Sequence, residues 1–334
     1  MSYAEHATEL LPWLQTDYER LVELKASQKL AHAYLFGGQQ GLGKLVLAKH
    51  FSHYLLCKSP QNNQPCGECR ECQLLASGTH PDLKLIQPED SSEIKIQQVR
   101  DSIHFISQTS QRGGYKIIII APAEALNINS ANALLKVLEE PSNNTLLILV
   151  SHQPALLMAT IRSRCHLMKF NRPAPELVIP WLESKNIRAS ATELLRMASN
   201  VPLRALHYAD EDALHDRTVL HTVLEKLLQG EMDISQAAGQ CEQFSLEANI
   251  EAMMLCSSDI LARNPVSDIN AAQTLHDHDL KNLSAFFQNS TRLKALHGFY
   301  QELLKARRAI TSTSNPNRLL VLEGLFFSWS ATIR

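Results

Sequence analysis

The chain has 334 residues, of which 45% are hydrophobic and 20% charged, and its formal net charge at pH 7 is −2. This composition predicts a folded globular protein of two or three domains and excludes a largely disordered chain. The near-zero net charge gives no overall basic field that would attract nucleic acid. The segment Met1–Gln15 lacks the basic start and apolar core of a signal peptide, and no apolar run approaches the roughly 18 residues of a membrane span. We therefore expect a cytoplasmic protein.

The first motif along the chain is a glycine-rich loop. An apolar run, Ala33–Phe36, predicts a strand, and Gly38 and Gly43-Lys44 follow it at the spacing G-x-x-x-x-G-K. In this P-loop pattern the backbone N–H groups close on phosphate and the lysine reaches its outer oxygens. The next residue should carry a hydroxyl that holds Mg²⁺, but it is Leu45. The pattern predicts a degenerate phosphate or nucleotide site, and a loop that stays empty is the alternative.

The second motif is a cysteine cluster. Four of the seven cysteines lie close together in the sequence, at Cys57, Cys66, Cys69 and Cys72. Their C-x₂-C-x₂-C spacing, with a fourth thiol upstream, can surround one zinc ion tetrahedrally. Such a closed site predicts a structural staple rather than a catalytic metal. An iron–sulfur cluster and cysteines without metal are the alternatives.

The remaining pattern up to about residue 170 alternates buried strands with helices. Four consecutive isoleucines, Ile117–Ile120, predict a strand buried on both faces. In a P-loop NTPase this strand should end in acidic residues that hold Mg²⁺ and orient water, but here Ala121 and Pro122 follow it. The other expected elements are strands at 83–86, 145–150 and 166–170 and helices at 45–56, 94–103 and 129–140. This alternation predicts a mostly parallel α/β sheet, whereas the chain beyond about residue 175 has helical spacing only.

Four stretches occur in the order typical of bacterial clamp-loader AAA+ subunits. They are His32–Gly38, the cysteine cluster, Ser130–Pro141 and Ser163-Arg164-Cys165. The chain therefore resembles the AAA+ clamp-loader family, and within it the delta-prime subunits of bacterial DNA polymerase III. The resemblance is strong to about residue 208 and weaker from there to the end.

This resemblance implies three domains. They would be an AAA+ α/β domain at 1–171 with the zinc insertion at 57–72, a small helical lid at 172–208, and an all-α collar at 209–334 that joins subunits into a ring. ATPase relatives of the gamma/tau type would carry Ser or Thr at position 45 and Asp-Glu at positions 121–122. Delta-prime-like subunits typically do not hydrolyse ATP, which agrees with the residues found here. Arg204 lies near the place of the lid arginine that reaches nucleotide in active relatives, and its role stays open.

The resemblance also implies a role for Arg164. In this family the Ser-Arg-Cys arginine projects across a subunit interface toward ATP bound by the neighbour. A guanidinium suits this task because it is always charged and presents a planar fork to phosphate oxygens. A surface salt bridge is the alternative role. In the preceding motif we expect the side chains of Asn132, Leu134, Leu135 and Leu138 to serve packing and interfaces.

We therefore expect a non-hydrolysing clamp-loader subunit within the DNA polymerase III holoenzyme. It would dock a delta subunit on one side, offer Arg164 to a gamma/tau ATP site on the other, and help to place the beta sliding clamp on primed DNA. One alternative is an active AAA+ ATPase of gamma/tau type that uses Lys44 and the displaced acid Glu124. Another is a nucleic-acid-binding zinc module, for which the cluster offers only Lys58 and Arg70.

Overall fold

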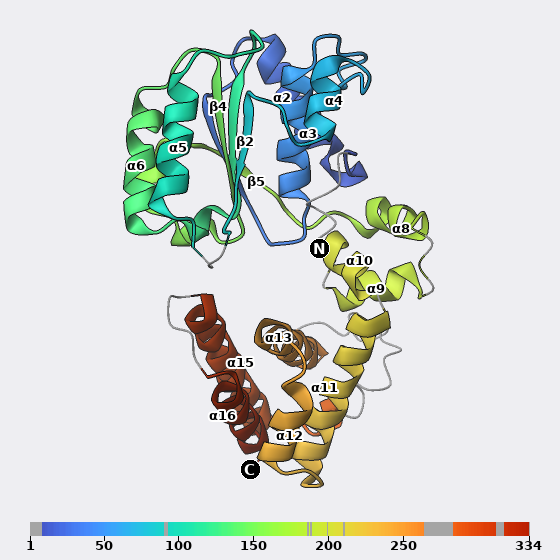
Figure 1. Cartoon of the computed structure of the whole chain (residues 1–334). Helices are drawn as coiled ribbons and strands as arrows, with labels where there is room; N and C mark the ends of the chain where they lie inside the picture. Colours follow the sequence, from blue (N-terminus) through green and yellow to red (C-terminus); the bar gives the residue numbers. More distant parts are fainter. Residues whose placement is uncertain are drawn as a thin grey trace. The chain divides into compact units, whose positions relative to one another are not determined.

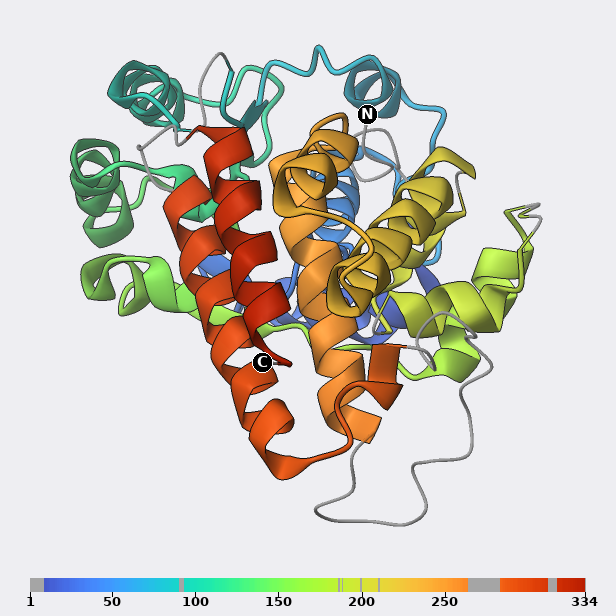
Figure 2. The same cartoon turned by 90° about the horizontal axis from the view of Figure 1, so that it is seen from below.

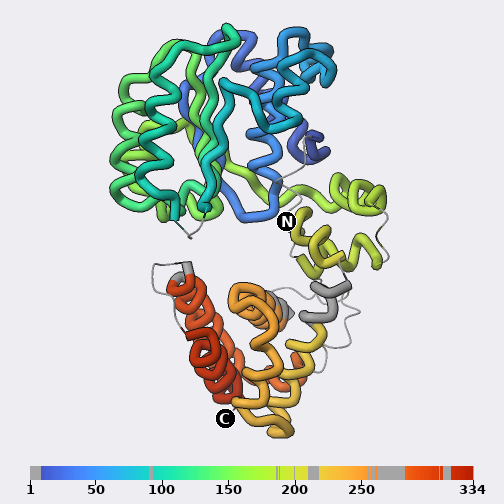
Figure 3. The backbone as a smooth tube through the Cα atoms, viewed as in Figure 1, coloured from blue at the N-terminus to red at the C-terminus, as the bar shows by residue number. Residues whose placement is uncertain are grey.

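The computed structural model describes residues 9–89, 93–185, 187, 189–198, 200–209, 211–263, 283–311 and 317–333. The chain divides into two compact units, Met1–Leu206 and His207–Arg334 (Figure 1). The backbone tube in Figure 3 shows both strands and helices in the first unit and helices alone in the described part of the second. The proposed boundary between an α/β domain and a separate lid at residue 171 falls inside the first unit and stays a prediction.

The first unit is built on a five-stranded parallel sheet with the order β2-β3-β4-β1-β5. The strands are β1 (Ala33–Gly37), β2 (Leu83–Ile86), β3 (Lys116–Ile120), β4 (Thr145–Ser151) and β5 (His166–Lys169). Every residue of the three central strands is buried, because helices cover both faces of the sheet. A parallel sheet with a glycine-rich loop after its first strand, together with the helical C-terminal part, confirms the predicted fold class.

Each face of the sheet is covered by its own set of helices. On one face lie α5 (Ile96–Ser107) and α6 (Ile128–Glu139), whose buried side chains pack against alternate residues of β3 and β4 such as Ile118 and Leu147. On the other lie α2 (Gln15–Ala26), α3 (Lys44–Leu56) and α4 (Arg70–Ala76) (Figure 1). Successive strand residues point to opposite faces, which is why the isoleucine run serves both layers.

Helix α6 has clear sequence signals at both ends. It begins after Asn127, whose side-chain oxygen accepts from the N–H of Ser130 at 2.9 Å, and it ends two residues before Pro141. Two more short elements, η3 (Pro154–Leu156) and α7 (Ala159–Arg162), link β4 to β5. The end of α6 and the turn after α7 carry the arginine site described below.

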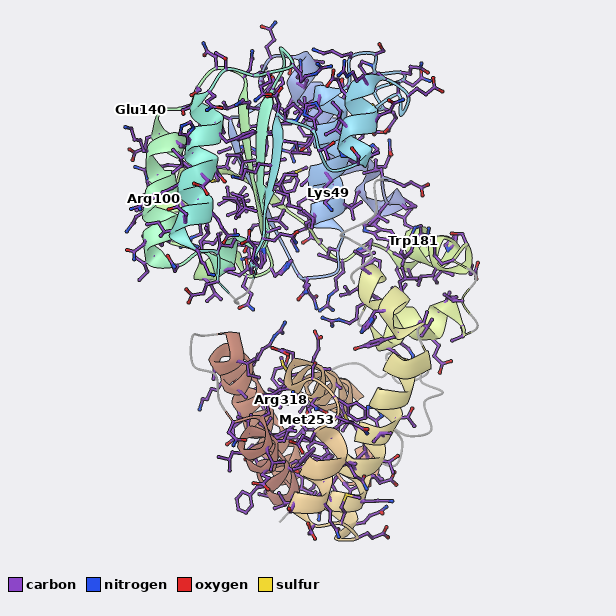
Figure 4. The ribbon with its side chains drawn as sticks, viewed as in Figure 1. Lys49, Arg100, Glu140, Trp181, Met253 and Arg318 are labelled. Atoms are coloured by element: carbon purple, nitrogen blue, oxygen red, sulfur yellow. The ribbon has the colours of Figure 1, made fainter. Side chains whose placement is uncertain are left out.

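Three short helices complete the first unit: α8 (Pro175–Glu183), α9 (Ala191–Met197) and α10 (Pro202–Tyr208), the last of which crosses the boundary between the units. Trp181 on α8, labelled in Figure 4, packs edge-on against Trp13 of η1 (Pro12–Leu14), with the ring centroids 4.9 Å apart. The N–H of Leu203 on α10 donates to the carbonyl of Gly41 at 3.1 Å. Helix α8 thus packs on the N-terminal segment, and the start of α10 contacts the glycine-rich loop.

The described part of the second unit is helical. It contains α11 (Glu211–Gln229), α12 (Ile234–Cys241), α13 (Leu246–Arg263), α15 (Ser290–Thr311) and α16 (Arg318–Ala331). Figure 2 shows α15 and α16 side by side, and Met253, labelled in Figure 4, is fully buried in the core that these helices share. Trp329 anchors that core, because its ring is buried and its Nε1–H donates to the carbonyl of Leu224 at 3.0 Å. Among the residues that the structure describes, no helix is both long and apolar enough to cross a bilayer.

Candidate functional site

The glycine-rich loop joins the end of β1 to the start of α3, at the carboxyl edge of the sheet. Helix α3 begins at Lys44, and Gly43 takes the N-cap position without a side chain that could cap the helix. The first N–H groups of a helix have no acceptor within the helix and form a natural anion site. The loop therefore keeps the backbone geometry of a phosphate cradle.

Two glycines of this loop are required by their surroundings. Gly41 and Gly43 have φ values of 88° and 90°, a region that side chains strongly disfavour. A Cβ on Gly41 would lie 2.6 Å from a methyl of Val201, and one on Gly43 would lie 2.5 Å from a methyl of Leu11. The N-terminal segment and the segment before α10 therefore pack directly on the loop.

Lys44 is turned into its own loop. The residue is 2% exposed, and its ammonium donates to the carbonyls of Gly38 at 2.6 Å and Gln39 at 2.7 Å. Burial lowers the pKa of Lys44 to about 8, and the negative charge of Glu124 opposes this shift. The lysine would have to exchange these carbonyl acceptors for phosphate oxygens in order to bind nucleotide.

The positions that would hold Mg²⁺ have no ligand atoms in their side chains. Leu45 is the second residue of α3, directly after Lys44, and Ala121 and Pro122 follow β3 directly. The nearest acid after β3 is Glu124 in η2 (Ala123–Ala125), whose Oε1 accepts from the N–H of His152 at 2.8 Å. Its other oxygen, Oε2, is buried without a hydrogen-bond partner. The residues present thus fit the phosphates of a nucleotide but not its metal ion.

Arg164 lies at the opposite edge of the sheet. It follows α7 and precedes β5, and β5 runs parallel to β1 with His166 opposite Tyr34. Arg164 is therefore at the amino edge, whereas the glycine-rich loop is at the carboxyl edge. The whole length of β1 therefore separates Arg164 from this chain's own loop.

The guanidinium of Arg164 is half exposed and held at the surface. Its Nη2 lies 2.6 Å from Glu139 Oε1, and its Nη1 donates to the carbonyl of Thr160 at 3.1 Å. Its Nε is buried and makes no hydrogen bond. The salt bridge considered from the sequence is therefore present in the isolated chain.

The four cysteines of the predicted metal site come together. Their sulfur atoms all lie within 4.8 Å of one another, and the separations from Cys57 to Cys66 and to Cys69 are 3.5 and 3.9 Å. A tetrahedral zinc site with Zn–S bonds of about 2.3 Å has S···S edges of about 3.8 Å. The N–H of Cys69 donates to Cys66 Sγ at 3.4 Å and lowers the pKa of the Cys66 thiol, which favours the thiolate form that metals bind. The donor set and its dimensions fit a metal such as zinc.

A buried polar cluster beside the cysteines was not predicted from the sequence. Glu71, next to Cys72 on α4, pairs with Arg112 through Nη2 at 2.6 Å and with His80 Nε2 at 3.1 Å. Asp82 accepts hydrogen bonds from Ser110 Oγ and from the backbone of the loop that contains Arg112. The Arg112 guanidinium holds the pKa of Glu71 below its ordinary value. The cluster links the cysteine insertion to the start of β2. No local spacing pattern in the sequence predicts this polar cluster.

Other expected residues are placed as follows. Leu134 and Leu138 of α6 are buried in the sheet core, and Asn132 is exposed. On α10, the backbone N–H of Arg204 would lie 3.6 Å from a Cβ on Gly41, so this helix borders the loop. The role of Arg204 stays a prediction.

The fold and the loop define the class: a P-loop α/β protein of the AAA+ type without metal-holding side chains at positions 45, 121 and 122. A family model described as "DNA polymerase III, delta subunit" matches residues 14–174, and one described as its C-terminal part matches residues 211–331. DNA polymerase III subunit delta' of Pseudomonas aeruginosa is 34% identical over 97% of this chain and 98% of its own length. The Escherichia coli subunit delta' is 31% identical over 94% of this chain and 93% of its own length. The chain belongs to the DNA polymerase III subunit delta' family.

Among solved structures, the chain is similar to a gamma subunit-related protein of DNA polymerase III from Thermotoga maritima. The TM-score is 0.47 at 17% identity, over 96% of this chain and all of the other. 

Proposed function

We propose that this chain is the non-hydrolysing delta-prime-like subunit of a replicative clamp loader. In that complex it would contact delta and gamma/tau subunits and help to place the beta sliding clamp on primed DNA, in the cytoplasm. Membership of the subunit delta' family, with 34% identity along nearly the whole chain to a named member, supports the assignment. Residues 1–171, 172–208 and 209–334 would act as the AAA+ domain, the lid and the collar that joins the ring.

One observation carries the non-hydrolysing role: the loop keeps Lys44 and its glycines but lacks all the metal-holding side chains. Phosphoryl transfer depends on Mg²⁺ to neutralise charge on the transferring group. With Leu45, Ala121 and Pro122 at the relevant positions, the loop can offer N–H groups and an ammonium to phosphates but cannot hold the ion. Gly38, Gly43 and Lys44 would therefore bind ATP or ADP without turning it over.

Arg164 would act on ATP bound by a neighbouring gamma/tau-type subunit. Its place at the sheet edge opposite its own loop supports a role in trans, and its half-exposed guanidinium supports contact with a partner. An always-charged planar fork stabilises the charge that develops on a transferring phosphoryl group. The cysteine cluster at Cys57, Cys66, Cys69 and Cys72 would hold a structural zinc ion, since four thiolates leave no open coordination position.

The rival function is an active ATPase of gamma/tau type that uses Glu124. Glu124 acts electrostatically on Lys44, and its Oε2 has no hydrogen-bond partner. Its Oε1, however, is engaged by the N–H of His152, and the residue lies beyond both positions where the strand-end acids are expected.

The deciding experiment is steady-state ATP hydrolysis by the purified chain with Mg²⁺ and primed DNA, with a gamma/tau-type protein as the positive control. We expect no turnover above background. Turnover that disappears with Lys44→Ala would refute the non-hydrolysing role and favour the rival. Turnover that Lys44→Ala leaves unchanged would identify a contaminating ATPase, and the assay would be repeated after further purification.

A further inference from the structure

The Arg164 guanidinium is held in place by two elements that meet at the amino edge of the sheet. Glu139, the last residue of α6, faces its Nη2 at 2.6 Å, and the carbonyl of Thr160 in α7 accepts from its Nη1 at 3.1 Å. The two contacts use different nitrogens of one guanidinium, so together they fix its orientation. Glu139 is half exposed, as is Arg164.

The backbone on both sides of this pair is fixed. Leu138 is buried against the sheet, and its carbonyl accepts from His32 Nε2 at 3.0 Å, which anchors the last turn of α6. The N–H of Arg164 donates to the carbonyl of Ile161 at 3.1 Å, which closes the turn after α7. Glu139 and Arg164 therefore face each other without any rearrangement of the chain.

This arrangement leaves the guanidinium incompletely satisfied. Its Nε–H is buried without an acceptor, and such a donor is destabilising until an acceptor reaches it. An ion pair between half-exposed side chains contributes little stability and is screened by salt. A phosphate group carries more acceptor oxygens than one carboxylate and matches the guanidinium fork. The pair with Glu139 is thus a contact that a phosphate can replace.

We propose that Glu139 is a positioning residue that holds Arg164 in a resting orientation and competes with phosphate for its guanidinium. This inference rests on the proposed role of Arg164 toward ATP on a neighbouring subunit. The inference adds Glu139 as the residue that sets how readily the Arg164 guanidinium leaves its ion pair. Removing the charge of Glu139 should make Arg164 more available, by about the two- to fivefold that an exposed ion pair supplies.

The first test uses the isolated full-length chain and needs no partner. Phenylglyoxal modifies accessible arginines, and peptide mass spectrometry reports the rate at each one. We expect Glu139→Gln to raise the rate at Arg164 two- to fivefold. Glu140→Gln is the matched control, because Glu140 caps the same end of α6 (Figure 4) and forms no ion pair among the described residues. Arg162, exposed two residues before Arg164, gives an internal reference. Equal rates at Arg164 in the wild-type chain and Glu139→Gln would overturn the inference.

The second test uses the chain assembled with its gamma/tau and delta partners. At low salt, Glu139→Gln should lower the KM for ATP about two- to fivefold with little change in kcat, and the difference should fade at high salt. In an Arg164→Ala background Glu139→Gln should change nothing. A higher KM or a lower kcat in Glu139→Gln would overturn the inference, as would an effect that persists without Arg164. If Arg164→Ala itself leaves hydrolysis unchanged, the proposed role of Arg164 fails, and the modification rates still report whether Glu139 restrains it.

Discussion

Lys44 and Arg164 are both cations suited to phosphate, and the same sheet presents them in different ways. Lys44 follows β1 at the carboxyl edge and is buried, and its ammonium donates hydrogen bonds to carbonyls of its own loop. Arg164 precedes β5 at the amino edge, is half exposed, and pairs with a surface carboxylate. The cation at the carboxyl edge is thus buried and hydrogen-bonded to its own loop. The cation at the amino edge is half exposed, and its contact with a carboxylate can be exchanged.

The difference is informative because, in the proposed function, the two edges would carry different parts of one reaction. A P-loop needs both its lysine and a metal ion to turn nucleotide over, and this chain keeps only the lysine. An arginine that acts on a neighbour's nucleotide needs no metal of its own. Under the proposed function, the chain would lack hydrolysis at its carboxyl edge and would still contribute to hydrolysis from its amino edge. The four predictions that follow test this division.

The largest effect is expected from Arg164→Ala in the assembled complex. Arginines that stabilise phosphoryl transfer are worth about 10³–10⁵ in rate in other NTPases. We expect hydrolysis at the neighbouring site to fall by at least about 10³-fold, measured as single-turnover ATP hydrolysis. Arg162→Ala, which removes an exposed arginine from α7 just before it, is the matched control and should leave the rate within twofold. Equal losses in both variants would assign the effect to the surface charge rather than to Arg164.

Removal of the metal should lower the stability of the first unit and leave the function of Arg164 unchanged. Cys69→Ser should lower bound zinc from one equivalent to none by elemental analysis, and the loss of a structural zinc ion should destabilise the first unit by several kcal/mol. Each kcal/mol lowers Tm by about 2–4 °C in a unit of this size, which thermal unfolding measures. Cys165→Ser, next to Arg164 and outside the cluster, should keep the full zinc content. Full zinc content in Cys69→Ser would show that the four thiols do not form the site.

A third prediction concerns the pH dependence of the inward-facing lysine. Phosphate binds the charged lysine and raises its pKa, so the bound state holds more protons than the free state above the free-state pKa. Because burial lowers that pKa to about 8, binding of ADP should weaken as the pH rises above about 8, by up to tenfold per pH unit. For an unperturbed lysine this decline would begin only near pH 10.4. Isothermal titration of the isolated chain measures the affinity.

Two controls accompany the titration. Lys44→Ala should bind ADP at least about tenfold more weakly at pH 7, because its charge-assisted hydrogen bonds to phosphate are lost. Adenosine, which has no phosphate, should show no pH dependence. Affinity for ADP that stays constant from pH 7 to pH 10 would mean that Lys44 does not contact the phosphates.

The sequence predicted the parts of this protein that depend on local spacing. Three patterns are local in the sequence: the isoleucine run of β3, the loop before Lys44 and the four clustered cysteines. The fold class predicted for the chain was confirmed. Helix α6 was predicted from residue 129 and begins at Ile128. Its capping residue, Asn127, lies directly before that first turn.

The contacts that decide how the site works join residues that are distant in the sequence. Glu71 and Arg112 are 41 residues apart, and Glu139 reaches Arg164 from a different helix. The inward turn of Lys44 depends on carbonyl directions in a folded loop. Such pairings follow from the tertiary arrangement of strands and helices rather than from any periodic pattern, so the sequence could name Arg164 but not its partner.

The smallest expected effect comes from Glu124, the acid that the rival ATPase role would use and whose charge acts on Lys44. Its negative charge opposes the lowering of the Lys44 pKa, so Glu124→Gln should lower that pKa further. The decline of ADP affinity should then begin below pH 8, and at pH 8 the variant should bind severalfold more weakly than the wild-type chain. Affinities at pH 6, where Lys44 is charged in both proteins, should agree within about twofold.

Glu93→Gln, which changes a carboxylate whose oxygen is 3.4 Å from the side chain of Asn127, is the control for loss of an acid elsewhere in the unit. Hydrolysis by the assembled complex should be unchanged in Glu124→Gln, because the proposed function places the turnover at the neighbouring site. A loss of hydrolysis of about 10²-fold or more would instead give Glu124 the role of a catalytic acid at this chain's own loop. The carboxyl edge of the sheet would then hydrolyse ATP itself.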